Sequence, residues 1–493
     1  MKKLILFLVI LSFQQFSVQS ETYNLDLQKS IEIAKLKSFN MLSLIQDLKI
    51  AEYNLKSATS SFKTHINLNF VSPQYTETVR QFEDSTGISF YPIKQLNYQG
   101  NVNINQPLPT DGYVYIRTGL SNYDDFYTSL RSTYLNTRIG LVQPIDALYG
   151  YNKIKSAYKT AELAYEYSKK GLKREELNLV YQVSSSFYNL LSDQKRAEIA
   201  RLDLDRQKEA YDISQNKYKA GLIKEVDALQ MEVDLAEAQN NYDVAIVNQN
   251  ASLNGFKQFI GIELSDSVSI SNEYKYEVVV VDSEKAVQLA KENRLEIREQ
   301  EIQIELNKLA IKRQKSEGMI QGDLTAYYEK VGVSGQEINT KFSTAVKNSY
   351  NDFLNRPQNY GVGFTVTVPI LDFGENRALV KAAESRLKKN MLQKEEVQRN
   401  IEREVRNLVA DLNSSLKRLQ LLEKNIVVAK KSFEITRQRY SDGDIDSQSL
   451  ALERKRLNTA YTSHLSAYTN YQLILADLMR KTFYDFQNNQ PIK

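Results

Sequence analysis

The sequence predicts a mainly α-helical protein that also contains a β-barrel and is built as a tandem duplicated repeat. Three observations lead to this prediction. The 493 residues include only 8 prolines and 18 glycines, which leaves room for very long helices. Segments around the prolines alternate between apolar and polar residues with the period of a strand. The same order of elements also occurs twice along the chain.

The composition excludes several classes of function. The chain has no Cys, which rules out disulfide frameworks, thiolate zinc sites and cysteine nucleophiles. Its two His, His65 and His464, lie far apart in the sequence, so we expect no metal site and no cofactor. The formal charge is +4, from 64 basic and 60 acidic residues. This near balance lacks the excess of basic residues that is typical of nucleic-acid-binding proteins. No phosphate-binding, dinucleotide or zinc-protease motif occurs, so the sequence does not predict an enzyme.

Residues 1–20 have the pattern of a secretory signal peptide. Lys2 and Lys3 precede an apolar run from Leu4 to Leu11, and small residues follow up to Ser20. The alternative, a membrane anchor, needs about 20 apolar residues, and this run is far shorter. No later segment approaches that length, so we expect any membrane-spanning part of the mature chain to be a barrel.

The proline-free stretches predict two long helices, over 152–216 and 375–439. Both are rich in Ala, Leu, Glu, Lys, Gln and Arg, which favour helices. From Ile401 to Phe433 apolar residues recur about every 3.6 positions, as on a helix that packs against other helices. About 65 residues give a helix roughly 100 Å long, longer than an ordinary globular domain.

Two segments, 64–145 and 320–371, predict strands. His65–Phe70 alternates strictly, and in Gly361–Ile370 every apolar side chain lies on one face. Tyrosines are scattered through both segments, as in the aromatic girdles of membrane barrels. A soluble antiparallel sheet with one wet face would alternate in the same way and remains the alternative.

These elements form two repeats, over 21–259 and 283–481. Three pairs of landmarks keep the repeats in register: Ala34-Lys35 with Ala290-Lys291, Pro144-Ile145 with Pro369-Ile370, and Tyr218-x-x-Gly221 with Tyr440-x-x-Gly443. The first repeat comprises a helix over 25–62, strands over 64–145, the long helix 152–216 and a helix over 223–259. The second comprises a helix over 283–317, strands over 320–371, the long helix 375–439 and a helix over 446–481. Between them, the connector 260–282 has a candidate extra strand at Val278–Val281, and 482–493 is a tail.

One copy of the chain supplies about four to six strands, whereas outer-membrane barrels begin at about eight. Either the sheet is not a barrel or several protomers share one. A shared barrel would also give the long helices identical neighbours. The helices would then project into the periplasm.

Two segments resemble TolC-family outer-membrane efflux proteins. Gly361–Ala378 resembles the strand-to-helix junction of their second repeat, with Pro369 and Gly374 here and Pro144 at the first junction. Tyr218–Leu229 resembles their helix-tip motif, and the match runs in order from Leu27 to Lys481.

The resemblance implies a homotrimer in the cell outer membrane. Its twelve-stranded barrel would take four strands from each protomer and continue into a periplasmic helical tunnel. Because 64–145 is long enough for four strands rather than two, we also expect an extra hairpin or a large surface loop there.

The resemblance further implies a passive exit duct for a tripartite efflux pump or type I secretion system. The implied partners are a periplasmic adaptor, a proton-driven or ABC-type inner-membrane pump, and outer-membrane lipid. The alternatives are an exported coiled-coil scaffold, which would leave membranes without detergent, and a hydrolase with paired carboxylates, for which no pocket context is recognisable. A stand-alone porin would not need the long helices.

Gly221 and Gly443 are expected to turn two helical hairpins, because glycine permits the positive φ of a tight turn. The resemblance implies that these tips form the periplasmic mouth and dock the adaptor through Tyr218, Gly221, Leu222 and Gly443. It also implies a hydrogen bond between Asp227 and Tyr440 that holds the duct shut. The alternative role of Asp227 is to favour the first turn of its helix through the helix dipole, worth about 0.3–1 kcal/mol.

The second tip departs from the family pattern. Ile445, Ser449 and Leu452 occupy the positions of the family's gate arginine and constricting aspartates. Three acids lie nearby instead: Asp442, Asp444 and Asp446. In a trimer they would surround the mouth and attract cations, which predicts cation-selective conductance; the alternative is an ordinary solvated loop.

Overall fold

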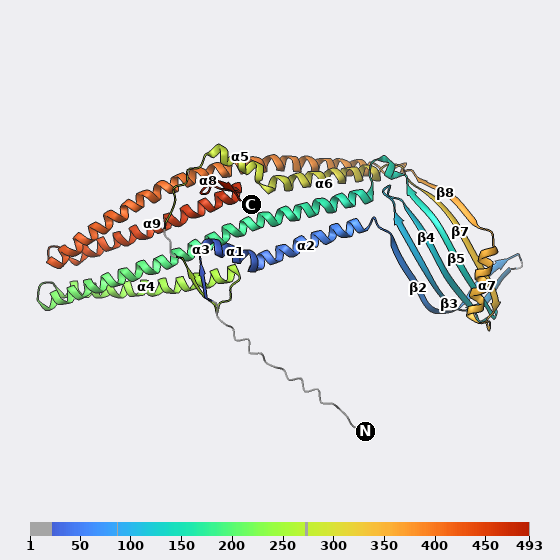
Figure 1. Ribbon diagram of the computed structural model, residues 1–493, viewed down its shortest axis with the longest axis horizontal. Helices are drawn as coiled ribbons and strands as arrows, with labels where there is room; N and C mark the ends of the chain where they lie inside the picture. Colours follow the sequence, from blue (N-terminus) through green and yellow to red (C-terminus); the bar gives the residue numbers. More distant parts are fainter. Residues whose placement is uncertain (1–21, 86, 272–274, 493) are drawn as a thin grey trace, which may run out of the picture. The chain divides into compact units, whose positions relative to one another are not determined.

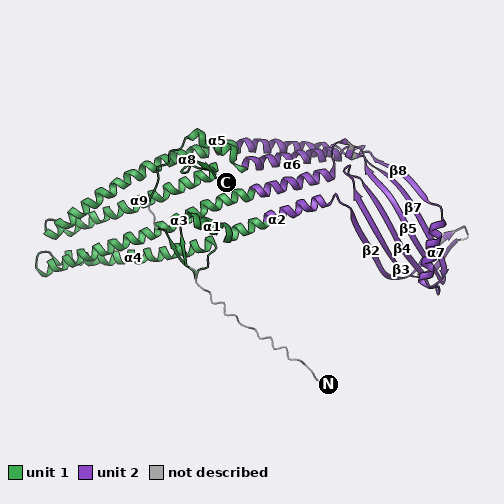
Figure 2. Cartoon of the chain, in the orientation of Figure 1, with its two compact units in different colours: residues 1–46, 171–295, 397–493 green, residues 47–170, 296–396 purple. Residues whose placement is uncertain are grey.

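The computed structural model describes residues 22–85, 87–271 and 275–492 (Figure 1). The predicted signal peptide lies outside these residues. The chain divides into two compact units, shown in Figure 2. Unit 1 contains the described residues up to Gln46, Gly171–Leu295 and the residues from Val397 onward. Unit 2 contains Asp47–Lys170 and Glu296–Glu396.

Two long helices, α3 (Lys153–Lys219) and α8 (Glu375–Asp442), have 67 and 68 residues. Each contributes residues to both units. A shorter helix of 36 residues follows each of them, α4 (Glu225–Ile260) and α9 (Ser447–Thr482). The buried residues of α8 recur at helical spacing, as the apolar period predicts: Ile401, Val405, Val409, Leu412 and Leu419.

The helices predicted over 25–62 and 283–317 are each broken once. The first divides into α1 (Leu27–Lys37) and α2 (Phe39–Ser60), and the second into α5 (Ser283–Asn293) and α6 (Leu295–Glu317). The residues at the breaks, Ser38 and Arg294, have extended backbone with ψ of 137° and 119°. Their N–H groups still bond to Ala34 and Ala290, so each helix ends with a local bond that lets the next begin at once. A one-residue break leaves the apolar period nearly intact, which is why the sequence predicts continuous helices.

The extra strand of the connector lies earlier than predicted. Strand β6 (Ser267–Ile270) pairs in parallel with β1 (Thr22–Leu25) in unit 1. Val278–Val281 lies outside any strand. Tyr471 of α9 satisfies the backbone there instead: its Oη accepts from Val279 N–H at 3.1 Å and donates to Glu277 O at 2.8 Å. The valine run was misleading because Val279 and Val281 are buried while Val278 and Val280 are exposed, which is the alternation of a strand, although the run lies outside any strand. The tail carries two further short strands, β9 (Tyr484–Asp485) and β10 (Gln490–Pro491).

Unit 2 contains a six-stranded sheet with the order β2-β3-β4-β5-β7-β8, and all neighbouring strands are antiparallel. The strands lie side by side in Figure 1. Their bounds are β2 His65–Asp84, β3 Gly87–Pro107, β4 Tyr113–Asp125, β5 Leu130–Pro144, β7 Gln321–Glu337 and β8 Asn359–Thr367. The sheet has two strands more than the four that the resemblance implies for the barrel, because the first strand segment forms two hairpins, which includes the extra hairpin expected from its length. The register between β2 and β3 shifts between Val71 and Gln74, next to Pro73, which lacks the N–H of a regular ladder.

A helix, α7 (Phe342–Asn355), lies inside the segment predicted as strands over 320–371. It packs against β7: Ser349 Oγ donates to Gly332 O at 3.0 Å, and Asp352 Oδ2 accepts from Val333 N–H at 2.7 Å. The spacing of Phe342, Ala345, Ser349 and Phe353 is helical and could have indicated this helix.

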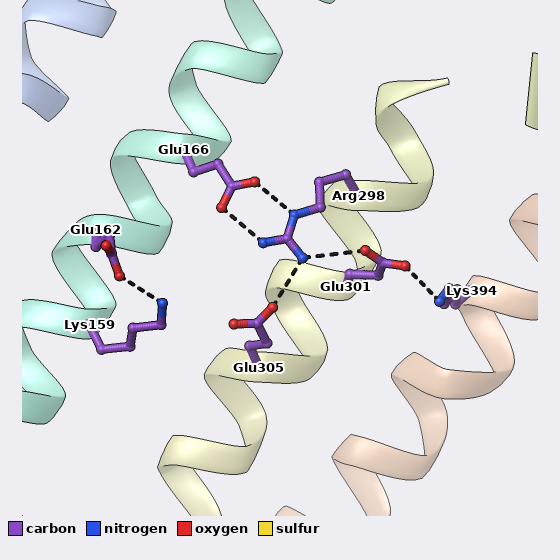
Figure 3. A network of polar contacts seen from close by, with 7 residues as sticks. All are labelled: Lys159, Glu162, Glu166, Arg298, Glu301, Glu305 and Lys394. Atoms are coloured by element: carbon purple, nitrogen blue, oxygen red, sulfur yellow. Dashed lines mark hydrogen bonds and ion pairs between the residues drawn. The ribbon is translucent and has the colours of Figure 1, made fainter. Parts of the chain in front are cut away.

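A charged network joins three helices of unit 2 (Figure 3). Arg298 of α6 donates to both carboxylate oxygens of Glu166 on α3, at 2.7 and 2.9 Å. It also reaches Glu301 and Glu305 of its own helix, and Lys394 of α8 binds Glu301 at 2.9 Å. The hydrogen bond from Arg298 lowers the pKa of Glu166, and that from Lys394 lowers the pKa of Glu301. The network therefore links α3, α6 and α8 within unit 2 through charged side chains.

None of the helices in the described part of the chain combines the length and apolar character that crossing a membrane needs.

Candidate functional site

The two helical hairpins of unit 1 turn with the same backbone motif. In the first, Gly221 N–H bonds to Tyr218 O at 2.9 Å and Leu222 N–H bonds to Lys217 O at 2.8 Å. In the second, Gly443 N–H bonds to Tyr440 O at 3.2 Å and Asp444 N–H bonds to Arg439 O at 2.9 Å. These are Schellman motifs, in which a residue of positive φ satisfies the last carbonyls of a helix. The φ values of Gly221 and Gly443 are 72° and 90°, so the sequence-based reason for both glycines is confirmed.

The matching tyrosines of the two tips have different surroundings. Tyr218 is 39% exposed, whereas Tyr440 is 2% exposed. Tyr440 belongs to an apolar cluster that joins all four helices of the hairpins, with Ala210 of α3, Met231 of α4, Phe433 of α8, and Leu450 and Leu457 of α9. The cluster packs the two hairpins together just behind their tips.

Lys217 holds Tyr440 most directly. Its Nζ donates to the Tyr440 carbonyl oxygen and lies 4.5 Å from the centre of the ring. The hydroxyls of Tyr440 and Ser214 are both buried, and neither makes a hydrogen bond of standard geometry within the described residues. Burial raises the pKa of the Tyr440 phenol, the nearby Ser214 hydroxyl partly offsets this, and the Asp227 carboxylate raises it further. Asp227 is thus close enough to act on Tyr440 through its charge, but no hydrogen bond joins the two in the part of the chain described, and the latch stays a prediction.

The three acids of the second tip each have a local partner. Asp442 accepts from Gln438 Nε2 at 3.0 and 3.3 Å, and Asp444 Oδ2 lies 4.0 Å from Arg439 Nε. Asp446 is the N-cap of α9 and accepts from Ser449 N–H at 2.8 Å. The bonds from the Ser449 side chain and backbone lower the pKa of Asp446, which keeps its charge. Asp446 therefore has a structural role as the N-cap of α9, in addition to any effect on ions.

The family's gate positions carry other roles here. Ile445 packs against the apolar cluster, and the backbone of Ser449 completes the cap of α9. Leu452 is 50% exposed. It lines a cavity between α4 and α9 of about 520 Å³, together with Asp234 and Arg454.

Arg454 carries a largely buried charge that the sequence prediction missed. It lies on α9 between α3 and α4, and its side chain is 15% exposed. Its guanidinium lies 3.9 Å from Asp203 of α3 and 3.8 Å from Asp234 of α4, and it donates to Gln207 of α3. The signal was present in the sequence, because Arg454 interrupts the buried stripe formed by Leu450, Leu457 and Tyr461. Arg454 is therefore a charged link between the two hairpins.

The strand-to-helix junctions are stabilised by carboxylates. After Pro144, the last residue of β5, Ile145 N–H bonds to Gly322 O at 2.8 Å, and Asp111 accepts from the first N–H groups of α3, Lys153 and Ile154. After Pro369, Asp372 accepts from Gly374 N–H at 2.9 Å and Asn376 N–H at 3.1 Å at the start of α8. Gly374 has φ of 86°. Both caps satisfy N–H groups that a helix start leaves free.

Within the described residues, no group of His, Asp and Glu has the arrangement to hold a metal ion.

Comparison with known proteins gives a family match over both repeats. The sequence model described as "Outer membrane efflux protein" matches residues 93–261 and 286–482. The first matched segment covers the later part of the predicted repeat 21–259, and the second covers nearly all of the predicted repeat 283–481. No match was found among curated proteins.

Solved structures with the same fold are similar over nearly the whole chain. The CmeC outer membrane channel of Campylobacter jejuni has a TM-score of 0.67 at 15% identity, covering 95% of this chain and 86% of that one. The MtrE outer membrane channel of Neisseria gonorrhoeae, in its open state, has a TM-score of 0.66 at 15% identity, with coverages of 95% and 90%. A membrane protein of Pseudomonas aeruginosa has a TM-score of 0.68 at 14% identity, with coverages of 93% and 91%.

Proposed function

The chain belongs to the outer membrane efflux protein family, and on that premise we propose that it is the passive exit duct of an efflux or type I secretion machinery. The observation that carries this proposal is the family match in order over both repeats, 93–261 and 286–482. The family is one of transport ducts rather than of enzymes. The duct lies in the outer membrane.

We propose that the working form is a homotrimer. A single six-stranded sheet is too small to close, because outer-membrane barrels begin at about eight strands. Copies of the chain must therefore share a barrel, and the same copies would flank the long helices. The energy for transport would come from a proton-driven or ABC-type pump in the inner membrane.

The first hairpin tip supports docking of a periplasmic adaptor. Four apolar or aromatic side chains around Gly221 are exposed: Tyr218 at 39%, Leu222 at 72%, Val226 at 65% and Leu229 at 52%. Exposed apolar residues gathered at one tip are typical of an interaction surface. The second tip carries aspartates at its turn instead, so we propose that the adaptor makes its apolar contacts at Tyr218, Gly221 and Leu222 and polar ones around Gly443.

We also propose that the gate lies just behind the tips. Tyr440, with Asp227 acting on it through its charge, and Arg454, with its two aspartates, connect the first hairpin to the second. Opening the mouth requires these hairpins to separate, so weakening the contacts should favour the open duct.

The test uses the full-length protein in planar lipid bilayers. Tyr440→Phe and Asp227→Asn should each raise the open probability relative to the wild type, whereas Tyr218→Phe, at the equivalent position of the other tip, should not. If neither variant conducts more than the wild type, the latch is wrong. Membrane fractionation tests the duct itself: release of the protein without detergent would indicate the scaffold and contradict the duct.

A further inference from the structure

We propose that all six strands of the sheet enter the membrane and that three copies close an eighteen-stranded barrel, in which β2 of one copy pairs with β8 of the next. The number follows from three copies of a six-stranded sheet. This inference rests on the proposed trimeric duct and specifies how its membrane wall is built.

The first argument is an apolar row that crosses every strand. Following the pairing from β2 to β8, the aligned residues are Ile66, Ile104, Ile116, Ile139, Tyr328 and Tyr360. At the two ends of the row, Ile66 is 67% exposed and Tyr360 is 79% exposed. An apolar row of this kind is what a lipid-facing barrel surface requires.

The second argument is the next row, on the opposite face. It is polar on all six strands: Asn67, Asn103, Arg117, Arg138, Glu329 and Asn359. These side chains interact with one another, since Arg117 Nε donates to Asn103 at 2.8 Å and Arg138 lies 3.7 Å from Glu329. In these two adjacent rows, an apolar face and a polar face thus alternate on all six strands, as between the lipid and lumen faces of a barrel.

The first hairpin, β2 with β3, takes part in both rows. If it were a loop outside the membrane, its residues would have no reason to repeat the apolar and polar rows of the other four strands in register. Instead Ile66, Leu68 and Phe70 on β2 are all at least 67% exposed on the apolar face. The extra hairpin is therefore part of the wall.

The third argument concerns the two edges of the sheet. In the described residues β2 pairs only with β3, and β8 pairs only with β7. An open edge in lipid leaves its backbone N–H and C=O groups without hydrogen-bond partners, which lipid cannot supply. Because six is an even number and every pair is antiparallel, β8 also runs antiparallel to β2 of a neighbouring copy. A second copy is thus the occupant that fits both edges.

An eighteen-stranded barrel is wider than the twelve-stranded one implied by the resemblance. Barrel diameter grows roughly linearly with strand number, so the diameter of this barrel would be roughly 1.5 times that of a twelve-stranded barrel. Barrels of 16–18 strands enclose an open aqueous channel.

The inference can be tested by cysteine crosslinking. Because the chain has no Cys, a crosslink can form only between the cysteines that are introduced. We would combine Asn67→Cys on β2 with Asn359→Cys, Thr365→Cys or Thr367→Cys on β8, all on the polar face, and treat membranes with a short thiol crosslinker. At least one pair should give a denaturing-gel ladder that ends at three copies. The matched control, Asn103→Cys on β3 with the same β8 partners, should give no ladder, since β3 is flanked by β2 and β4.

The outcomes separate this inference from the proposed function. Crosslinking of β8 to Arg117→Cys on β4, but not to Asn67→Cys, would show a barrel without the first hairpin and overturn the inference while leaving the duct intact. A ladder that ends at two copies, with a matching native mass, would mean a twelve-stranded dimer and also overturn it. Release of the protein without detergent would overturn both proposals.

A second measurement does not depend on crosslinking. Spin labels would be attached to the single variants Leu68→Cys and Asn67→Cys, reconstituted in lipid. The label at Leu68 should collide with a lipid-soluble paramagnetic relaxation agent, and the label at Asn67 with a water-soluble one. Water exposure of the label at Leu68 would contradict a membrane position for β2.

Discussion

At the scale of single residues, side chains at equivalent positions of the two repeats differ in how deeply they are buried. Tyr218 and Tyr440 stand at equivalent positions of the two repeats, yet one is exposed and the other is 2% exposed. The tip motif predicts both turns. It does not predict which tyrosine is buried, because some of the residues that bury Tyr440 are far from it in the sequence, such as Ala210 of α3 and Met231 of α4.

Arg454 gives a prediction at this scale. In Arg454→Met, Asp203 and Asp234, whose side chains are 14% and 11% exposed, would lose their shared cation. We expect the variant to lose about 1–3 kcal/mol of stability, because partly buried acceptors would be left unsatisfied. The same loss should raise the open probability of the duct. Thermal melting in detergent and bilayer recording are the measurements.

The control for Arg454 is Arg456→Met, two residues further along α9. The Arg456 side chain is 63% exposed, and its ion pair within the described residues is with Glu453 of its own helix. We expect this variant to change stability by no more than about 0.5 kcal/mol. Equal effects of the two substitutions would contradict the role given to Arg454.

At the scale of elements, the tip glycines are required by backbone conformation rather than by space. A Cβ on Gly443 would meet no atom within 4 Å, but φ is 90°. Gly443→Ala should therefore destabilise the hairpin by about 1–2 kcal/mol. Gly171 in α3 also has open space and lacks the positive φ, so Gly171→Ala should stabilise the protein by about 0.5–1 kcal/mol. Melting temperatures that shift in the same direction for both variants would refute this explanation.

The docking of α7 on the sheet depends on Gly332. A Cβ there would lie 2.0 Å from Ser349 O and 2.6 Å from Phe353 Cβ. Gly332→Ala should push α7 away at a cost of about 1–3 kcal/mol, whereas Gly335→Ala, with nothing within 4 Å, should leave it in place. Limited proteolysis of intact protein should cut α7 faster only in the first variant. Equal cleavage of the two would show that α7 is not held by this contact.

At the scale of the whole molecule, a trimer would gather the acids of three tips around one mouth. Replacing Asp442, Asp444 and Asp446 together by Asn should move the cation-to-anion permeability ratio of the open duct toward one, because the fixed charge is removed. Asn also caps helices well, so the start of α9 is preserved. The control is Asp411→Asn, an exposed acid on α8 outside the tip. Unchanged selectivity of the triple variant in bilayers would assign these acids to local structure alone.

The sequence by itself determined the class and order of the elements. Helical and strand periods, the positions of the prolines and two positive-φ glycines depend on residues close together in the chain, and these signals predicted the long helices, the strand segments, the duplication and the turns at Gly221 and Gly443. The family resemblance added the expected function.

Only the tertiary structure decided the remaining features. The breaks at Ser38 and Arg294, the strand at Ser267–Ile270 instead of Val278–Val281, the burial of Tyr440, the partners of Arg454 and the membership of β2 and β3 in one six-stranded sheet all came from it. Each of these depends on which distant segment supplies a hydrogen bond, a charge or an apolar surface. A local sequence pattern does not identify that distant partner. The same alternating segment can therefore form a loop, an edge strand or a strand in the middle of a sheet.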